Sequence, residues 1–398
     1  MQDYNISIIV MDTLRNDTFS EIFQKQGLAH DNFFLYDKCI APAPWTLPSH
    51  ASLLSGMYPS SHGAHETKKV KSLNIEQIKL KHKTIVSYLK QNGYNTSCIS
   101  ANPYVHPIYG FDEFNFFYEE SYFTDIFGSV IEISDELKPK ISEYRNKFGN
   151  NIIELSKAII KEDPNLFIDV FFSSAARTPR AAAKKIKAKF IDGWPLEKGG
   201  SKIVKKIKDM DFDKKSFLFV NLMEAHDPYI GKKNMDFNWS TPFKDKPIDP
   251  DLIKIWKKIY LKGSMLSYNY ANSITKNLLD RYGEDQIIIL VSDHGQALGE
   301  NGFVGHGTVL DDEVIRVPLA IYAPRKIKQK KIEGYQSLVN IPEFIKFALI
   351  GSANASTKLT SKKVISESFS IPANLYSTPG INMKKVARYD KKITRIFE

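Results

Sequence analysis

The chain has 398 residues, of which 42% are hydrophobic and 12% aromatic, and its formal net charge at pH 7 is +10. This composition excludes a disordered protein and predicts a large buried core. The two cysteines, Cys39 and Cys98, are too few for a disulfide framework, and no apolar run approaches the roughly 18 residues of a membrane-spanning helix. The first residues lack the basic segment and long apolar stretch of a secretory leader, so we expect a cytoplasmic protein.

Short segments that are apolar or β-branched throughout predict five strands, at residues 6–11, 95–100, 216–222, 286–292 and 317–323. Helical patterns lie between these strands, at residues 49–57, 84–93 and 266–283. Strands of this kind are typical of a sheet that helices cover on both faces. The alternation of strands and helices therefore predicts an α/β fold with a mostly parallel central sheet flanked by helices.

Two elaborations of this core are predicted. Between about residues 115 and 210 the sequence becomes aromatic and then charged, with helical patterns and no clear strand, which predicts a helical insertion into the main domain of residues 1–330. Residues 331–398 predict a small C-terminal α+β subdomain. It contains a helix at residues 340–351, followed by the stretches "KKVISES" and "KKVARYDKKITRIF", which favour strands of a small sheet.

The positive charge is concentrated in one segment. Between Arg177 and Lys208 there are eleven basic residues and two acidic ones, which accounts for nearly all of the excess. One interpretation is a solvated helix face, and the other is a surface that docks on an anionic membrane. Nucleic-acid binding is disfavoured, because only Phe190 and Trp194 are interleaved with the basic residues for stacking on bases.

Polar residues follow three of the predicted strands, where the carboxyl ends of parallel strands meet at one edge of a sheet. Asp12 follows the first strand, His226 the third, and Asp293 with His294 the fourth. Taken singly, Asp12 has an ordinary explanation as a helix cap and Asp293 as a turn residue. Together, two carboxylates and an imidazole predict a site for a metal ion.

A hydroxyl residue is presented to the same edge by the stretch "APWTLPSHASLLSGMYPSSHG", residues 43–63. Thr46 lies between two prolines, and we expect a helix that begins near His50 and points its N–H groups toward an anion. His306, in "FVGHG", lies on a loop that can reach the same place. A hydroxyl held beside a metal ion is typical of nucleophilic catalysis.

Four stretches in this order resemble the sulfatase and alkaline-phosphatase superfamily, over most of residues 5–325: "SIIVMDTLRND", "APWTLPSHASLLSGMYPSSHG", "FVNLMEAHDPY" and "VSDHGQALGENGFVGHGTVLDDEVIRVPLAIYAP". The resemblance implies an alkaline-phosphatase-like fold and an enzyme that hydrolyses or transfers an anionic phosphate or sulfate ester. The tail after residue 330 resembles the family weakly, and the basic segment does not resemble it.

The sequence departs from the sulfatase signature, in which a cysteine or serine is followed by one residue, proline, one residue and arginine. Thr46 occupies the position of the residue that sulfatases oxidise to formylglycine, and His50 stands where the arginine is expected. Threonine cannot become formylglycine. The chain therefore resembles the branch that includes phosphodiesterases and phosphoethanolamine or glycerophosphate transferases, which favours a phosphoester and leaves hydrolysis and transfer both open.

The resemblance implies a metal site made of Asp12, Asp293 and His294, completed by the oxygen of Thr46. The imidazole ligand favours manganese or zinc, with calcium or magnesium as alternatives. A second metal ion would need another Asp/His/His set, so we expect a single ion at this site.

The resemblance also implies that His226 and His306 bind the anionic oxygens of the substrate or its leaving group, and both are candidates for proton donation. His50 and Asn102 are further candidates for substrate binding, although Asn102 before Pro103 is also explained as a turn cap.

Two alternatives stay open. One is a true sulfuric ester hydrolase that works without formylglycine. The other is a catalytically silent protein that keeps the fold and docks on an anionic membrane or polymer. The intact set of Asp12, Thr46, Asp293 and His294 argues against a silent protein. The oligomeric state is left open.

Overall fold

The structure is a computed structural model. It describes residues 2–66, 80, 82–105, 107–117, 143–144, 159, 161–163, 197–212, 215–227, 229, 237, 240–328, 332–369, 371 and 379–398. The chain divides into two compact units, one made of Met1–Tyr118 with Asp192–Glu398 and the other of Glu119–Ile191. Nearly all of the second unit lies outside the described residues. The expected helical insertion therefore stays a prediction, as does the basic segment up to residue 196.

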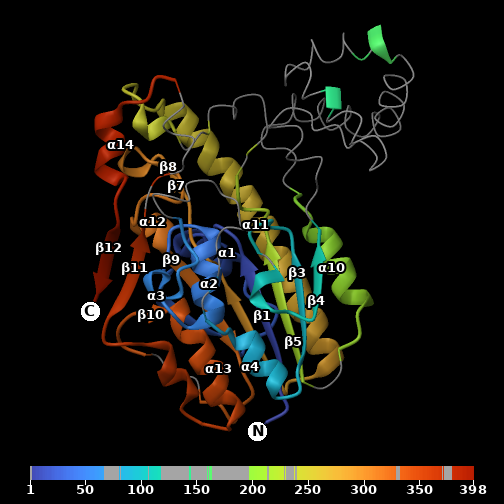
Figure 1. Cartoon of the computed structure of the whole chain (residues 1–398). Helices are drawn as coiled ribbons and strands as arrows, with labels where there is room; N and C mark the ends of the chain where they lie inside the picture. Colours follow the sequence, from blue (N-terminus) through green and yellow to red (C-terminus); the bar gives the residue numbers. More distant parts are fainter. Residues whose placement is uncertain are drawn as a thin grey trace. The chain divides into compact units, whose positions relative to one another are not determined.

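The first unit is built around a sheet of eight strands in the order β10-β2-β9-β6-β1-β5-β3-β4 (Figure 1). The strands are β1 (Asn5–Met11), β2 (Phe34–Ile40), β3 (Asn95–Ser100), β4 (Glu113–Phe116), β5 (Ser216–Leu222), β6 (Gln286–Val291), β9 (Arg316–Tyr322) and β10 (Gln336–Ser337). Within this sheet, β9 alone runs opposite to the others. The predicted mostly parallel central sheet is confirmed.

All five predicted strands are present, as β1, β3, β5, β6 and β9. The sequence did not predict β2, in which buried residues alternate irregularly with exposed ones and the pairing with β9 shifts register between Tyr36 and Cys39. A bulged strand of this kind lacks the continuous apolar run that marks the central strands. β4 is a short edge strand with no fully buried residue.

Helices cover both faces of the sheet, because the side chains of each strand alternate between two apolar layers. In β1, for example, Ile8 and Val10 belong to one layer and Ile9 and Met11 to the other. The first layer includes residues of α2 (Thr46–Ser55), α4 (Ile85–Gln91) and α13 (Ile341–Leu349). The second includes residues of α1 (Asn16–Gln26), α10 (Gly200–Asp209) and α11 (Pro250–Tyr282).

The predicted helices are present, but two of them begin earlier than expected. α11 begins at Pro250 rather than near residue 266, and the side chain of Asp249 caps it. α2 begins at Thr46 rather than near His50. Pro48 is compatible with this start, because N–H groups in the first helical turn need no partner within the helix.

The C-terminal residues are tied closely to the sheet. β10 pairs with β2, and α13 packs against α2, so residues after 330 belong to the same compact unit as the strands before them. The expected small sheet is present: β11 (Val364–Ser368) pairs antiparallel with β12 (Ile393–Phe397). The first half of the stretch "KKVARYDKKITRIF" is not a strand as expected but a short helix, α14 (Met383–Tyr389), which the side chain of Asn382 caps.

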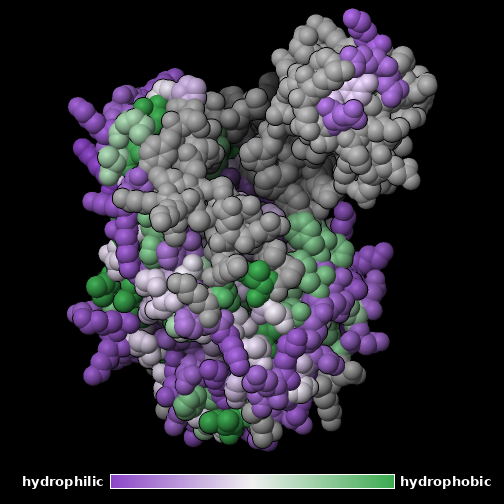
Figure 2. Space-filling view, viewed as in Figure 1, coloured by the Kyte–Doolittle hydropathy of each residue, from purple (hydrophilic) through white to green (hydrophobic). Residues whose placement is uncertain are grey.

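Of the basic segment, the structure describes residues 197–208. Lys198 is only 1% exposed and therefore does not belong to a surface stripe. The rest lies on α10, which buries Ile203, Val204 and Ile207 against the core. Its outward side carries Lys202, Lys205, Lys206 and Lys208, called the α10 lysines below. Figure 2 shows hydrophilic side chains over much of the described surface on the side of α10. Within the described residues, no helix combines the length and apolar character needed to cross a membrane.

Candidate active site

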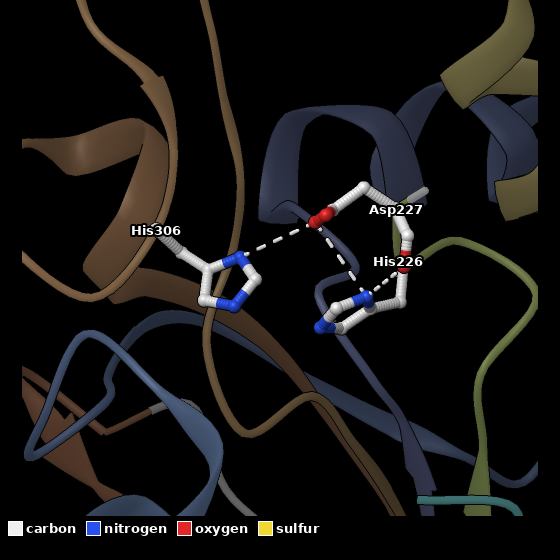
Figure 3. A group of neighbouring side chains, drawn as sticks. All are labelled: His226, Asp227 and His306. Atoms are coloured by element: carbon white, nitrogen blue, oxygen red, sulfur yellow. Dashed lines mark hydrogen bonds and ion pairs between the residues drawn. The ribbon is translucent and has the colours of Figure 1, made fainter. Parts of the chain in front are cut away.

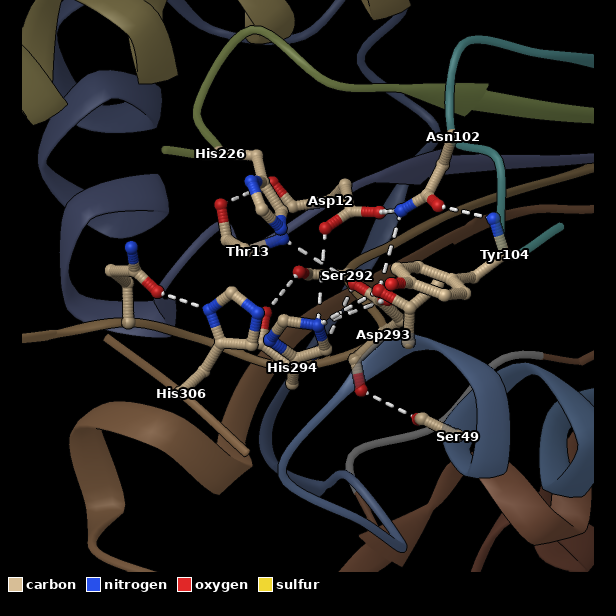
Figure 4. Close-up of polar contacts among 12 residues, drawn as sticks. Asp12, Thr13, Ser49, Asn102, Tyr104, His226, Ser292, Asp293, His294 and His306 are labelled. Carbon is tan, nitrogen blue, oxygen red and sulfur yellow. Dashed lines mark hydrogen bonds and ion pairs between the residues drawn. The ribbon is translucent and has the colours of Figure 1, made fainter. Parts of the chain in front are cut away.

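Thr46, the expected nucleophile, is the first residue of α2 and is 2% exposed. Its Oγ1 lies 3.3 Å from Nε2 of His294 and accepts a hydrogen bond from Nδ2 of Asn102, also at 3.3 Å. One turn further along α2, the Ser49 hydroxyl donates to the main-chain oxygen of Asp293 at 2.6 Å (Figure 4). The hydroxyl is therefore held at the carboxyl ends of β3 and β6, because Asn102 and His294 follow these strands.

Each of the two buried carboxylates, Asp12 and Asp293, has one oxygen bonded and one unpartnered. Oδ2 of Asp12 accepts from Asn102 Nδ2 at 2.6 Å and from Asn221 Nδ2 at 3.1 Å, whereas its Oδ1 has no hydrogen-bond partner. Oδ1 of Asp293 accepts from the backbone N–H groups of Thr13, at 3.3 Å, and His294, at 3.0 Å, whereas its Oδ2 has none. An unpartnered buried carboxylate oxygen is costly unless a cation meets it.

The backbone at Thr13 adopts an unusual conformation that directs its N–H group toward the Asp293 carboxylate. Its φ of 61° lies in the left-handed region, which β-branched residues rarely adopt. Two contacts fix this conformation: the Thr13 N–H donates to Asp293, and the Thr13 carbonyl oxygen accepts from the Tyr260 hydroxyl at 2.8 Å. Arg15 follows in the same loop and pairs with Asp17 at 2.6 Å and with Glu300 at 3.0 Å.

The second ring nitrogen of His294 faces the unpartnered oxygens of the two carboxylates. Its Nδ1–H donates to the carbonyl oxygen of Gly295 at 2.9 Å, which leaves Nε2 with a lone pair. Nε2 lies 3.3 Å from Oδ2 of Asp293 and 3.9 Å from Oδ1 of Asp12. Burial lowers the pKa of His294 to about 4, so the ring is neutral near pH 7.

The ligand atoms of Asp12, Asp293 and His294 lie within 4.8 Å of one another, and all three residues are buried. Burial, and the charge of Asp12, raise the pKa of Asp293 well above its ordinary value. Burial alone would also raise the pKa of Asp12, but the neighbouring histidines bring it below its ordinary range. The unpartnered oxygens of the two carboxylates and the lone pair on Nε2 of His294 form a donor set that fits a divalent cation.

A second polar cluster, made of His226, Asp227 and His306, lies beside the first (Figure 3). Oδ1 of Asp227 is 3.5 Å from Nδ1 of His226 and 3.8 Å from Nδ1 of His306. The ring centroid of His306 lies 4.8 Å from that of His226 and 4.5 Å from that of His294. This is an Asp/His/His set of the kind that a second ion would need.

In the second cluster, Oδ1 of Asp227 and Nδ1 of both histidines have protein partners. Gln296 Nε2 donates to Oδ1 of Asp227 at 2.9 Å, and this fixes the amide so that its Oε1 accepts from Nδ1–H of His306 at 2.6 Å. Nδ1 of His226 bonds to the main-chain oxygen of Asp227. Burial, with His294 and His226 nearby, lowers the pKa of His306 well below its ordinary value, so its Nε2 is a proton acceptor in the neutral ring.

His50 takes a different position from the expected substrate contact. Its side chain is fully buried, and burial lowers the pKa of the ring. Its Nδ1–H donates to the main-chain oxygen of Thr46 at 2.9 Å, and its Nε2 accepts from Asn221 at 3.3 Å. Both nitrogens are thus used inside the protein, and the ring supports the first turn of α2. Asn102 has the contact of a turn cap, because its Oδ1 accepts from the backbone N–H of Tyr104 at 2.8 Å, whereas its expected role in substrate binding stays a prediction.

Lys198 and Asn221 contribute to the site but were not singled out from the sequence. The ammonium of Lys198 donates to the main-chain oxygens of Glu224, at 3.3 Å, and His226. It therefore braces the turn that carries His226. Burial lowers the pKa of Lys198 to about 8 and raises that of Glu224 to about 7. A polar Asn221 inside an apolar strand was the one available signal, whereas Lys198 has the local pattern of a surface lysine.

Comparison with known proteins identifies the family. The sulfatase family model matches residues 5–346. The chain is 22% identical over 410 residues to an arylsulfatase of Clostridium perfringens, which covers 91% of this chain and 78% of that protein. It is 45% identical over 58 residues to the low-salt glycan biosynthesis sulfotransferase Agl7 of Haloferax volcanii, and this match covers 15% of the chain and spans only 13% of that protein.

A solved structure shares the fold. The phosphonate monoester hydrolase from Silicibacter pomeroyi matches with a TM-score of 0.54 and 14% identity, over 99% of this chain and 85% of that one. At this identity the likeness establishes the architecture alone, which is the alkaline-phosphatase-like sheet expected from the sequence. Because the family model spans most of the chain, and the sheet carries the buried polar cluster at its carboxyl edge, the chain belongs to the sulfatase family.

Proposed function

We propose that the protein is a metal-dependent enzyme that hydrolyses or transfers an anionic ester, a phosphoester in preference to a sulfate ester, with Thr46 as the nucleophile. The observation that carries this proposal is the position of Thr46 Oγ1, 3.3 Å from His294 Nε2 and next to the half-satisfied carboxylates of Asp12 and Asp293. Membership of the sulfatase family supports the ester class.

Asp12, Asp293, His294 and Thr46 would hold one divalent ion. Bound there, the ion would lower the pKa of the Thr46 hydroxyl and offset the charge of the transferred group. The imidazole favours manganese or zinc over calcium or magnesium. A single ion is favoured because Oδ1 of Asp227 already accepts from Gln296, whereas Asp12 and Asp293 each keep a buried oxygen without a hydrogen-bond partner.

In the first chemical step, a bond forms between Thr46 Oγ1 and the phosphorus or sulfur as the bond to the leaving oxygen breaks. The Thr46 proton passes to solvent, and the leaving oxygen takes a proton from His226. In the second step, water or an acceptor hydroxyl displaces Thr46, and its proton is accepted at Nε2 of His306, whose Nδ1–H is committed to Gln296. This assigns the two histidines opposite roles.

The preference for phosphorus follows from the residue itself. A formylglycine hydrate can release sulfate by collapsing to an aldehyde, whereas an ester of Thr46 must be displaced at phosphorus or sulfur. His50 acts as a positioning residue in this scheme, because it bonds the main-chain oxygen of Thr46. Docking on an anionic membrane through the basic segment, and a cytoplasmic location, stay predictions.

A substrate panel tests the proposal. Aryl phosphate monoesters and diesters, phosphonates and aryl sulfates are supplied with manganese, zinc, magnesium or calcium. We expect a phosphoester to be turned over fastest, Thr46→Ala to lower kcat about a thousandfold or more, and Thr46→Ser to keep part of the activity. Faster turnover of an aryl sulfate would move the function to sulfuric ester hydrolysis. Wild-type turnover by Thr46→Ala would remove the nucleophile from the proposal.

A further inference from the structure

A pocket of about 450 Å³ lies outside the cluster of polar residues described above. It is lined by residues 241–248, residues 301–303 and one side of α14 (Lys385, Arg388 and Tyr389). Its volume falls in the range of sites that bind small molecules. Neither the metal site nor the proposed mechanism uses any of these residues.

The walls of the pocket are fixed to one another. The Asn382 N–H donates to the main-chain oxygen of Phe243 at 2.8 Å, and the Lys385 ammonium donates to the main-chain oxygen of Lys244 at 2.6 Å. The rings of Phe243, Phe303 and Tyr389 pack edge-on, with centroids 5.1 to 6.2 Å apart. These contacts hold the three stretches of the chain that line the pocket in fixed positions.

The lining carries more positive than negative charge. Among the lining residues that the structure describes, the one carboxylate, Asp245, accepts from Asn382 at 2.8 Å and lies 3.5 Å from the ammonium of Lys385. Within the part of the chain that the structure describes, the side chains of Lys244, Lys246 and Arg388 form no ion pair or hydrogen bond. Three unpaired cations in one concave site favour an anionic ligand.

One wall of the pocket belongs to a hairpin whose two ends reach the candidate active site. Gln296 and His306, which contact each other, flank a small hairpin made of β7 (Ala297–Leu298) and β8 (Val304–Gly305). The turn of this hairpin supplies residues 301–303 to the pocket. Two residues separate Phe303 from His306, so their Cα atoms are at most about 11 Å apart. In Figure 1, α14 is drawn beside β7 and β8.

We propose that this pocket binds the distal part of the substrate, and that this part is a sugar ring carrying an anionic group such as a carboxylate, sulfate or phosphate. Phe303 and Tyr389 line the pocket and are partly exposed, so they supply apolar surface on which a sugar ring can pack. Asp245 accepts hydrogen bonds from the hydroxyl groups of the sugar, and Lys246 and Arg388 form ion pairs with its anionic group. The placement next to the ester site rests on the proposed function, whereas binding of the acidic sugar does not.

The test measures binding directly by calorimetry at low salt. The probes are a disaccharide that contains glucuronic acid, its neutral counterpart that contains glucose, and a nucleoside monophosphate. We expect wild-type protein to bind the acidic disaccharide about tenfold or more tightly than the neutral one, and the double variant Lys246→Ala, Arg388→Ala to lose this preference. Both side chains are exposed, so the fold, checked by circular dichroism, should be retained.

The matched control is Lys384→Ala, Lys391→Ala, which removes the same charge from exposed positions outside the pocket and should keep the preference. Equal binding of the two disaccharides by wild type, or a preference that survives in the pocket variant, would overturn the proposal. Tighter binding of the nucleoside monophosphate would overturn the assignment to a sugar. Turnover of a simple aryl phosphate by wild type is measured separately, because its absence would contradict the proposed function and leave the pocket's result unaffected.

Discussion

His62 should make the stability of the protein depend on pH in a predictable direction. It ends α3 (Pro59–His62) and is fully buried behind the helix that carries Thr46. Its Nδ1 accepts from the Ala64 N–H at 3.0 Å, and its Nε2–H donates to the Ser52 hydroxyl at 2.9 Å. A second proton would lie on Nδ1, against the N–H of Ala64. Burial is the main cause that lowers the pKa of His62 to about 4.

The sign and size of the effect follow from this depressed pKa. The unfolded chain binds a proton at His62 below about pH 6.5, whereas the folded protein does so only below about pH 4. The stability is therefore fully present above the unfolded pKa and is lost progressively as pH falls toward the folded pKa. Between about pH 7.5 and about pH 5 the loss should be about 2 kcal/mol.

Urea unfolding of wild type and His62→Gln, followed by circular dichroism across this pH range, measures the effect. Glutamine does not titrate and can keep the donor to Ser52. The other buried histidines titrate in both proteins and cancel in the difference. We expect the wild-type advantage over the variant to shrink by about 2 kcal/mol on acidification. A difference that does not vary with pH would refute the reasoning about the two hydrogen bonds of His62.

Three further predictions concern the metal, Lys198 and the α10 lysines. Metal-stripped protein should take up one manganese or zinc ion per chain, and the Asp293→Asn variant should bind this ion at least tenfold more weakly. Uptake of two ions per chain would show that the His226 cluster also binds metal. Lys198→Met should destabilise the protein by about 2 kcal/mol in urea unfolding, because it leaves the main-chain oxygens of Glu224 and His226 without the ammonium that donates to them, and an unchanged midpoint would contradict the bracing role. Reversing the charge of the α10 lysines should weaken binding to anionic vesicles by about 1 kcal/mol per contact at most, and unchanged binding would leave them a solvated face.

Much of the fold could be predicted because its central strands are buried on both faces. Continuous apolar runs such as residues 216–222 have no other stable place in a globular domain. The same logic located Asp12, Asp293 and His294, since parallel strands end at one edge. β2 escaped prediction because only part of it is buried, and its bulge hides the alternation.

The fine structure of the site could not be predicted, because it depends on contacts between distant positions. Asn221 bonds Asp12 from 209 residues away, and Gln296 reaches Asp227 across 69. His50 was expected to face the substrate because it stands at the signature's arginine position. In the helix that begins at Thr46, however, the ring of His50 bonds back to the main-chain oxygen of Thr46, the first residue of that helix. The position of His50 follows from the start of α2 at Thr46, which the sequence did not predict because Pro48 suggested a later start.

The central claim is that Thr46 carries the transferred group, and a rapidly quenched single turnover tests it most directly. Wild type and Thr46→Ala are mixed with the best ester of the panel, quenched in acid, digested and examined by mass spectrometry. The account predicts a phosphoryl or sulfuryl adduct on the wild-type peptide that contains Thr46, formed and lost within one turnover, and no adduct in Thr46→Ala. An adduct on another residue, or rapid turnover by Thr46→Ala, would contradict it.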